Sequence, residues 1–446
     1  MARLFGTDGV RGVANRELTP ELAFKLGRAG AYVMAGSGGR MVVGRDTRIS
    51  GDMLQAALSA GICSAGVDVL NVDVIPTPAV ALLTRNLGAD GGVVISASHN
   101  PVDDNGIKFF GPSGFKLSDD KERLIEEMLA DPTNEVPTPV GAGVGRINQL
   151  PDADNRYIDL LKQTMRQTTD LDLRGLKVAV DCANGAAYRV APRILAELGA
   201  EVTPLFNTPD GVNINRDCGS THPDQLRQAV IDSGADLGLA HDGDADRLLA
   251  VDHRGALVDG DQIMVMCAKH LKEQGRLPHN TVVVTVMSNM GLHMAMREAG
   301  IEVAQTAVGD RYVLAELLRT GAAFGGEQSG HLLYLDHSPT GDGILSALQL
   351  LAVVQSTGRS LADLAAQMER LPQLLENVPV VNKHRVMASP ELARAIKETE
   401  KRLNGQGRVL VRPSGTESLV RVMAECRDEK QLRQVVDELT ELVRRI

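Results

Sequence analysis

Three aspartates at alternate positions, Asp242, Asp244 and Asp246, form the sharpest chemical motif of the chain, in the segment DGDADR. The segment directly follows the apolar run LGLA, and alternate residues of an extended segment point to the same side. Three carboxylates on one side repel one another and attract a cation, and oxygen ligands favour a hard ion, Mg²⁺ or Ca²⁺. An EF-hand is excluded because its glycine and glutamate positions hold Arg247 and His253. The alternative is a solvated acidic turn.

A serine with neighbouring proton donors forms the second motif, ISASHNP. Ser98 lies in a loop after an apolar run, His99 follows it, and Lys108 comes shortly afterwards. These residue types suit a nucleophile or a carrier of a phosphoryl group. The composition by itself favours an ordinary turn, so both interpretations stay open at this point.

The third motif, RPSGTE, combines groups that bind a phosphate dianion. Arg412 offers a bidentate fork, Ser414 and Thr416 offer hydroxyls, and Gly415 lets backbone N–H groups approach closely. Arg421 follows a few residues later. A hairpin turn explains the segment equally well, and the pattern of a P-loop is absent from the sequence.

A fourth motif, GGEQSGH, has the groups with which proteins bind vicinal sugar hydroxyls. Glu327 and Ser329 supply a carboxylate and a hydroxyl, His331 an imidazole, and the glycines permit close approach. A glycine-rich turn is the alternative. Further cations in loop-like segments, each a phosphate ligand or merely a surface charge, are Arg11, Arg45 and Arg48.

The elements that position these motifs repeat along the chain as an apolar run, a polar loop and a stretch with helical periodicity. Such units begin at residues 41–50, 176–187 and 281–292, and later partner strands lie at 91–101, 235–247 and 322–331. Apolar strands alternating with helices indicate parallel sheets covered on both faces, with ligands at the carboxyl ends of the strands. The sequence therefore predicts an α/β fold whose polar loops gather at comparable sheet edges.

The length of 446 residues predicts two to four domains, and the organisation along the chain favours four. Three successive α/β domains with mixed, largely parallel sheets are followed by a smaller C-terminal α+β domain. A Pro/Gly-rich stretch at 131–146 ends the first, and LPQLLENVPVV at 371–381 leads out of the third. The last segment is typical of a helix, two strands around a turn and a helix. The predicted domains are 1–150, 151–255, 256–370 and 371–446.

The composition excludes several classes of protein. A net charge of −10 and 3% aromatic residues without Trp argue against a nucleic-acid partner. The five cysteines are scattered singly, which indicates reduced, buried thiols and neither a disulfide framework nor a zinc ribbon. Since the sequence contains no apolar signal region and no run of about 18 apolar residues, we expect a soluble cytoplasmic protein without a membrane partner.

Taken together, ISASHNP, DGDADR, GGEQSGH and RPSGTE, in this order and at these separations, resemble the four signatures of the α-D-phosphohexomutase superfamily. The likeness extends from Phe5 to Arg421, and the opening FGTDGVRG is most similar to the branch that acts on glucosamine phosphates. The superfamily has three α/β domains and a smaller C-terminal domain around a central cleft, in agreement with the organisation predicted above. The resemblance favours the phosphoryl-carrier interpretation of Ser98 over an ordinary turn.

The resemblance implies a role for each motif. Ser98 is expected to carry a phosphoryl group, which makes phosphoserine part of the active enzyme. One Mg²⁺ ion is expected to be held by the phosphorylated Ser98 with Asp242, Asp244 and Asp246. The sugar hydroxyls are expected to bind Glu327 and Ser329. The non-reacting phosphate of the substrate is expected to bind Arg412, Ser414, Gly415, Thr416 and Arg421. The groups expected around the reacting phosphoryl group are Arg11, His99, Lys108, Arg247 and His331, with Lys108 and His331 as partners for proton transfer.

The implied reaction interconverts glucosamine 6-phosphate and glucosamine 1-phosphate through a 1,6-bisphosphate that turns end for end, and supplies cell-wall precursors through UDP-N-acetylglucosamine. Three alternatives remain: a relative that acts on mannose or glucose phosphates, a sugar-phosphate sensor without catalysis, and a phosphatase. A homodimer is compatible with the sequence, which does not determine the oligomeric state.

Overall fold

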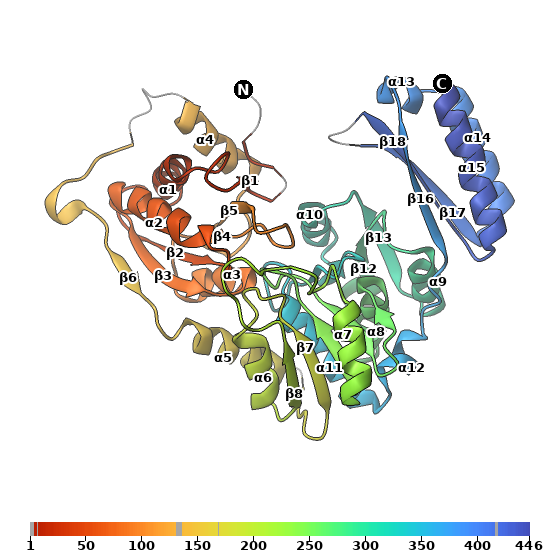
Figure 1. The fold of residues 1–446 in the computed structure, drawn as a ribbon, viewed down its shortest axis with the longest axis horizontal. Coiled ribbons are helices and arrows are strands. Elements are labelled where there is room, and N and C mark those ends of the chain that lie inside the picture. Colours follow the sequence, from red (N-terminus) through yellow and green to blue (C-terminus); the bar gives the residue numbers. More distant parts are fainter. Residues whose placement is uncertain (1–3, 7, 131–135, 168, 415–417) are drawn as a thin grey trace. The chain divides into compact units, whose positions relative to one another are not determined.

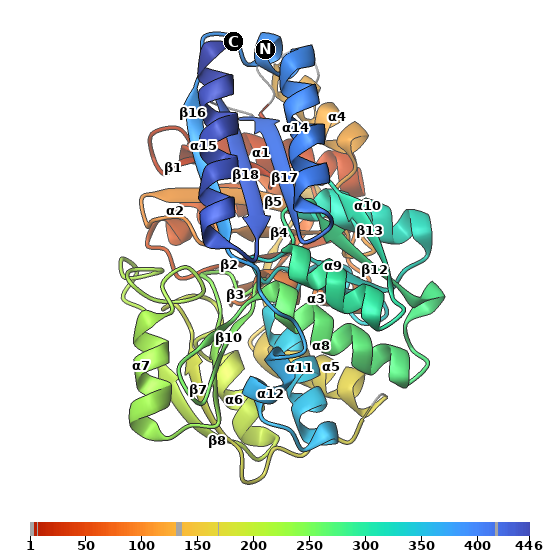
Figure 2. The ribbon, with the colours of Figure 1, turned by 90° about the vertical axis from the view of Figure 1, so that its right-hand side faces the viewer.

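The computed structural model describes residues 4–6, 8–130, 136–167, 169–414 and 418–446. The chain forms two compact units (Figures 1 and 2). The first unit is Met1–Met287 with Ile301–Ala366, and the second is Ser288–Gly300 with Gln367–Ile446.

The first sheet of the first unit has six strands in the order β1-β5-β4-β2-β3-β6. β4, β2, β3 and β6 are parallel, whereas β5 and β1 join antiparallel at one edge. The strands are β1 (Val10–Val13), β2 (Arg40–Arg45), β3 (Asp68–Val74), β4 (Gly91–Ile95), β5 (Asp104–Phe110) and β6 (Ile147–Gln149). The helices are α1 (Pro20–Ala35), α2 (Ser50–Ser64), α3 (Thr77–Asn86), α4 (Asp119–Ala130) and the short 3₁₀ helix η1 (Gly141–Gly143).

Helices cover both faces of this sheet. Met41, Val43 and Val93 pack with α1, α2 and α4 in one apolar core. The neighbouring positions Gly44 and Gly92 face α3 on the other side, as period-two alternation requires. The near-continuous apolar strands are therefore buried on both faces of the sheet, and the polar loops lie at the strand ends.

The second sheet follows the same plan with the order β11-β10-β9-β7-β8, in which β9, β7 and β8 are parallel. β10 and β11 complete it antiparallel. The strands are β7 (Lys177–Asp181), β8 (Glu201–Leu205), β9 (Leu237–Ala240), β10 (Leu249–Asp252) and β11 (Leu257–Val258). The helices before and between them are α5 (Ala153–Arg166), α6 (Val190–Glu197) and α7 (Asp224–Ser233).

The third sheet has the order β13-β12-β14-β15, with a parallel core and an antiparallel last strand. Its strands are β12 (Thr281–Thr285), β13 (Glu302–Thr306), β14 (Phe324–Gly326) and β15 (Leu332–Tyr334). The helices of this part of the first unit are α8 (Gly260–Glu273), η2 (Pro278–Asn280), α10 (Asp310–Thr320), α11 (Gly343–Thr357) and α12 (Leu361–Ala365). The three repeated units of the sequence thus build three mixed sheets of related topology.

The second unit contains an antiparallel sheet in the order β16-β18-β17. Its strands are β16 (Gln373–Pro379), β17 (Gly407–Pro413) and β18 (Leu419–Cys426). Its helices are α9 (Met290–Glu298), α13 (Lys383–Met387), α14 (Pro390–Leu403) and α15 (Glu429–Arg445). Figure 2 shows α14 and α15 side by side over this sheet, where they bury an apolar core that includes Val420, Val422 and Val436.

The predicted fold class is confirmed: three α/β parts with mixed, largely parallel sheets and a smaller α+β part. One strand was missed: residues 373–379, inside the segment 371–381 that was interpreted as leading out of the third domain, form the edge strand β16. The segment's prolines at 372 and 379 hid the strand, although an edge strand tolerates proline. The domain boundaries stay predictions. Among the described residues, no helix is long and apolar enough to cross a bilayer.

Candidate active site

The three aspartates of DGDADR come together after β9. One carboxylate oxygen from each of Asp242, Asp244 and Asp246 lies within 4.8 Å of the others, and all three side chains are buried. The loop is a turn and not the extended segment assumed from the sequence: the N–H of Ala245 donates to the Asp242 carbonyl at 3.1 Å, and Ala245 has φ +59°. The carboxylates therefore converge because the chain turns around them.

The buried carboxylates of this loop favour a cation. Burial raises the pKa of Asp242 well above its usual value, and the neighbouring carboxylates of Asp246 and Asp244 add to the effect. Oδ1 of Asp244 and Oδ1 of Asp246 are buried without a hydrogen-bond partner among the described residues. Bonds of about 2.0–2.6 Å between a hard divalent ion and oxygen fit a cluster of this size. The donor set thus suits a divalent metal ion.

Ser98 lies against the aspartate cluster. It follows β4, is 2% exposed, and its Oγ donates a hydrogen bond of 2.5 Å to Oδ2 of Asp242. Its backbone has φ +52°, a left-handed conformation that directs the serine side chain out of the strand line and that few residues other than glycine adopt. Two segments separated by 144 positions in the sequence thereby bring the serine hydroxyl into contact with the metal-type cluster, by which we mean Asp242, Asp244 and Asp246.

A buried ion pair that the sequence did not identify supports the serine loop. Arg48 is fully buried, its Nε lies 2.9 Å from Oδ2 of Asp46, and Oδ2 of Asp46 also accepts from the Ser96 hydroxyl at 2.6 Å. Nη2 of Arg48 donates to the carbonyls of Ser98 and Asn100 at 2.9 and 2.8 Å. The sequence suggested a phosphate ligand or a surface charge for Arg48. Its position directly after the buried strand β2 was the one sequence feature that could have indicated burial.

Asn215 is a second residue that sequence reasoning missed. Its Nδ2 donates to the carbonyl oxygens of Ser98 at 2.8 Å and of Asn100 at 3.1 Å. It lies in a loop after β8 with φ +57°. A single asparagine in a polar loop carries no signal that would have distinguished it, because its acceptors come from a distant part of the chain.

Lys108, on β5, is paired with the metal-type cluster. Its Nζ lies 2.9 Å from Oδ2 of Asp244, and the Thr77 hydroxyl donates to the same oxygen at 2.7 Å. Burial by itself would lower the pKa of Lys108, but Asp244 and other nearby carboxylates outweigh this effect and raise the pKa. Lys108 therefore carries a positive charge next to Asp244.

His331, before β15, lies between two carboxylates. Nδ1 is 3.5 Å from Oδ2 of Asp246, and Nε2 is 3.7 Å from Oδ2 of Asp310. Burial would lower the pKa of His331, but the carboxylates outweigh it and raise the pKa to about 9. Gly341 makes room for the ring, since a Cβ there would lie 2.3 Å from Nε2 of His331. Asp310 was missed; it begins α10 and follows β13, a strand that was not predicted from the sequence.

The remaining predicted cations of the first unit have partners. His99 Nδ1 lies 3.2 Å from Oγ of Ser98. The N–H of Arg247 donates to Oδ1 of Asp242 at 3.3 Å, and its Nε is 3.8 Å from Oδ1 of Asp246. Arg11 is ion-paired at 2.7 Å, through Nη2, with Oδ2 of Asp8 on the N-terminal loop. Arg247 and His99 thus adjoin the serine and the aspartates, while Arg11 is held by its own loop.

The GGEQSGH segment forms a tight turn between β14 and β15. The N–H of Gly330 donates to the Glu327 carbonyl at 2.9 Å, and Oε1 of Glu327 accepts from Gly309 at 3.0 Å. Glu327 and Ser329 are both half-buried in this turn. Gly330 has φ +89°, and a Cβ there would lie 2.1 Å from the carbonyl oxygen of Leu248, next to the aspartate loop. The turn therefore packs directly on the segment that leaves the metal-type cluster.

The remaining motif, RPSGTE, lies at the end of β17 in the second unit. Arg412 and Arg421 occupy opposite positions on β17 and β18, and burial together with Arg421 lowers the pKa of Arg412. Lys383 Nζ donates to the Ser414 carbonyl at 2.6 Å, a contact that the sequence analysis did not anticipate. Gly415 and Thr416 lie outside the described residues.

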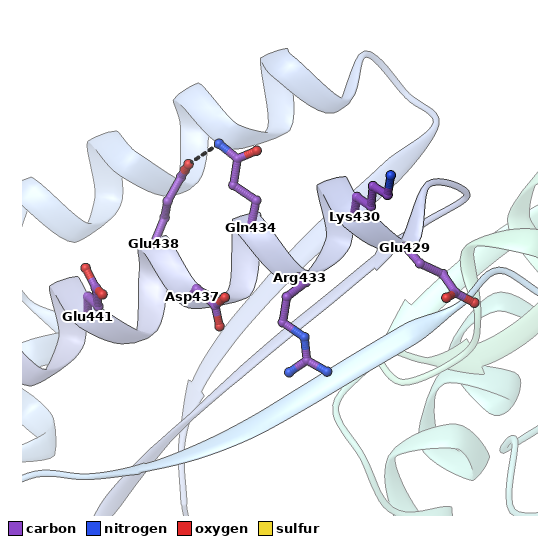
Figure 3. A pocket seen from close by; sticks show the side chains of 7 residues that line it. All are labelled: Glu429, Lys430, Arg433, Gln434, Asp437, Glu438 and Glu441. Carbon is purple, nitrogen blue, oxygen red and sulfur yellow. Dashed lines mark hydrogen bonds between the residues drawn. The ribbon is translucent and has the colours of Figure 1, made fainter.

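A separate hollow on the second unit, along the outer face of α15, is a less suitable site (Figure 3). It is lined by Glu429, Lys430, Arg433, Gln434, Asp437, Glu438 and Glu441. Gln434 and Glu438 are joined by a hydrogen bond of 2.8 Å. None of the sequence-predicted residues lines this hollow, so it carries no candidate chemistry.

Three α/β parts, an α+β part and a serine beside an aspartate cluster define a phosphohexomutase, and comparison with known families agrees. The models of the phosphoglucomutase/phosphomannomutase family match in order: alpha/beta/alpha domain I at residues 2–135, domain II at 155–255, domain III at 259–371 and the C-terminal domain at 375–442. The chain belongs to this family, as its motifs predicted.

One protein with a similar sequence and two solved structures show what the chain is similar to within this fold. A protein of Desulforamulus reducens named phosphoglucosamine mutase is 64% identical over 445 residues, which cover 99% of each chain. A solved phosphoglucomutase/phosphomannomutase family protein from Burkholderia thailandensis is 26% identical with a TM-score of 0.81, covering 99% of this chain and 98% of that one. The Aspergillus fumigatus N-acetylphosphoglucosamine mutase, solved with GlcNAc-6P and magnesium, shares the fold at 18% identity and a TM-score of 0.70, covering 99% and 95%.

Proposed function

We propose that this chain is an isomerase that interconverts glucosamine 6-phosphate and glucosamine 1-phosphate. The observation that carries the proposal is the hydrogen bond of 2.5 Å between Ser98 and Asp242. It places a hydroxyl that can carry a phosphoryl group beside a cluster suited to a divalent ion. The 64% identity to a phosphoglucosamine mutase favours glucosamine phosphates over mannose or glucose phosphates as substrates.

Mg²⁺ is the proposed metal, held by one oxygen each of Asp242, Asp244 and Asp246 and by the phosphorylated Ser98. When bound, it would neutralise charge on phosphoryl oxygens. Phosphoryl transfer passes through a loose transition state, so the protein contributes mainly by positioning groups and stabilising charge. Lys108 and Arg247 adjoin the same aspartates, and we assign them to the reacting phosphoryl oxygens, together with His99 and Arg11.

The proposed chemistry balances in two transfers. In the first, the P–O bond to Ser98 Oγ breaks while the free 1-hydroxyl of glucosamine 6-phosphate forms a new P–O bond, giving the 1,6-bisphosphate. The hydroxyl gives its proton to one member of the pair Lys108 and His331, which must first release its own proton, and Oγ gains a proton from the other member. After the bisphosphate turns end for end, the 6-phosphoryl group returns to Ser98 and glucosamine 1-phosphate remains.

Substrate binding is assigned to the two other motifs. Glu327 and Ser329 would bind the sugar hydroxyls. Arg412, Ser414 and Arg421, with Gly415 and Thr416, would hold the phosphate that does not react. Two arginines at facing strand positions favour a dianion, because an anion between them relieves their repulsion.

The product would feed synthesis of UDP-N-acetylglucosamine, and we propose the cytoplasm as the location. Five free, buried cysteines support a reducing compartment.

A Ser98→Ala variant tests the proposal, with Ser64→Ala at the end of α2 as the control. We expect Ser98→Ala to lose turnover of glucosamine 6-phosphate by at least about a thousandfold while it still binds the sugar phosphate. The wild-type chain should carry phosphate on the peptide that contains Ser98, as seen by mass spectrometry. Unchanged turnover in Ser98→Ala would reject the proposed carrier.

The same assay separates the other candidates. Preferred turnover of glucose or mannose 1-phosphate by the wild-type chain would reject the glucosamine assignment. Release of inorganic phosphate as the main product would indicate a phosphatase. Binding of the sugar phosphate without any turnover would indicate a sensor.

A further inference from the structure

The amino-terminal end of α11 packs directly on the aspartate loop. The N–H of Gly343, the first residue of α11, donates to the carbonyl of Ala245 at 3.0 Å. A Cβ on Gly343 would lie 2.1 Å from the carbonyl oxygen of Arg247. No side chain fits between the helix and the loop, so a shift of α11 would move the backbone that carries Asp244 and Asp246.

A buried hydrogen-bonded pair determines where α11 begins. Asp342 is 1% exposed, and its Oδ1 accepts from the N–H of Leu345 at 2.9 Å as the cap of the helix. The hydroxyl of Tyr157, a fully buried residue of α5, lies 2.9 and 2.8 Å from the two oxygens of Asp342. Among the described residues, the side-chain partner of this carboxylate is thus an uncharged phenol from another helix.

The same short segment also contacts the opposite side of the site. Gly341 lies against the ring of His331, where a Cβ would come within 2.3 Å of Nε2. Residues 341–343 therefore contact both His331 and the aspartate loop. Their position depends on Asp342, since the residues on either side of it are the glycines that make these close contacts.

We propose that Tyr157 and Asp342 are positioning residues for the metal site: the phenol fixes the carboxylate, the carboxylate fixes the start of α11, and α11 holds the aspartate loop in its ion-binding shape. Neither side chain belongs to the proposed metal ligands or to the residues assigned to the substrate. The inference rests on the metal site of the proposed function and adds two residues that no sequence motif indicated.

The test measures metal binding directly. Mn²⁺ serves as the probe, and its binding to the purified full chain without substrate is followed by electron paramagnetic resonance. Tyr157→Phe removes the hydroxyl and retains the ring. We expect its Kd for Mn²⁺ to rise about tenfold, the lower end of the effect of residues that support metal ligands. The KM for the sugar phosphate should stay within about twofold of the wild-type value.

Two substitutions at Asp342 sharpen the test. Asp342→Asn keeps a capping oxygen for Leu345 and should bind Mn²⁺ within about threefold of wild type, whereas Asp342→Ala should lose at least as much affinity as Tyr157→Phe. The control is Asp252→Asn, a buried carboxylate at the far end of β10 from the aspartate loop. Its Kd should not change.

The outcomes are distinct. A Tyr157→Phe chain with a lower thermal transition and an unchanged Kd for Mn²⁺ would show a purely structural role and overturn the proposal. A wild-type chain that binds no Mn²⁺ at millimolar concentration would also overturn it. Failure of glucosamine phosphate turnover alone would reject the proposed substrate and leave the effect on Mn²⁺ binding intact.

Discussion

Charged side chains are arranged differently in two regions of the molecule. One region is the serine and aspartate loops of the first unit, and the other is the end of the β17–β18 hairpin in the second unit. In the first region each cation has a nearby carboxylate: Arg48 with Asp46, and Lys108 with Asp244. In the second, Arg412 and Arg421 face each other across the strands. One region is held by its own ion pairs, whereas the other concentrates positive charge.

This contrast indicates which part of the proposed reaction each region can perform. Phosphoryl transfer benefits from groups whose positions are determined in advance, and buried ion pairs and hydrogen bonds provide such positions. Binding a phosphate that alternates between two ends of a sugar requires affinity for a dianion, and two arginines at facing strand positions favour one. We therefore expect substitutions in the first region to change activity and thermal stability, and substitutions in the second region to change the KM for the sugar phosphate.

The largest effect is expected from Arg48→Met. It leaves Asp46 buried without its cation and removes one of the two side-chain donors to the Ser98 carbonyl. Breaking a buried ion pair costs about 3–5 kcal/mol. We expect activity to disappear and the first thermal transition, measured by calorimetry, to fall by several degrees. Arg45→Met is the matched control, because Arg45 pairs with the exposed carboxylates of Asp52 and Asp73. Equal destabilisation by both variants would contradict the ranking.

A smaller effect of another kind is expected from Arg412→Ala. We expect the KM for glucosamine 6-phosphate to rise about a hundredfold with kcat little changed, since a charged hydrogen-bond donor to phosphate contributes about 1.5–3 kcal/mol. Thermal stability should not fall, because one of two facing like charges is removed. Arg402→Ala, which removes an exposed arginine paired with Glu438, is the control and should leave KM unchanged. A loss confined to kcat would contradict this assignment.

The smallest effect is expected from Lys116→Met in the first unit. Lys116 pairs with Asp8 at 2.6 Å and with Asp310, and these two carboxylates adjoin Arg11 and His331. We expect kcat to fall about tenfold, which corresponds to a rise of about 1.4 kcal/mol in the activation free energy. The reason is that Asp8 and Asp310, which adjoin Arg11 and His331, lose the cation that holds them in place. Steady-state kinetics check this, with the exposed Arg123→Met as the control. An unchanged kcat would show that Lys116 does not position the site.

Local motifs made much of the site predictable. Asp242, Asp244 and Asp246 are close in the sequence, so their charge repulsion could be recognised without knowing the fold. The fold class followed from repeated apolar strands and helical periodicity. The geometry of the aspartate loop could not be predicted, because a turn at Ala245 and not an extended strand brings the carboxylates together.

Residues that act over long sequence separations were not predictable. Arg48 is bonded to the carbonyl of Ser98, 50 positions away, and Asn215 to the same carbonyl, 117 positions away. A charged or amide side chain in a loop looks alike whether it is solvated or buried. Only the positions of its acceptors distinguish the two cases.

Residue types and their spacing were enough to indicate the kinds of chemistry available, the order of the motifs and the family. The tertiary structure alone decided that the Ser98 hydroxyl touches Asp242, that Arg48 is buried, and that α11 adjoins the aspartate loop. These contacts join segments far apart in the chain. They form because packing three sheets brings their polar strand ends together, and no local pattern encodes that approach.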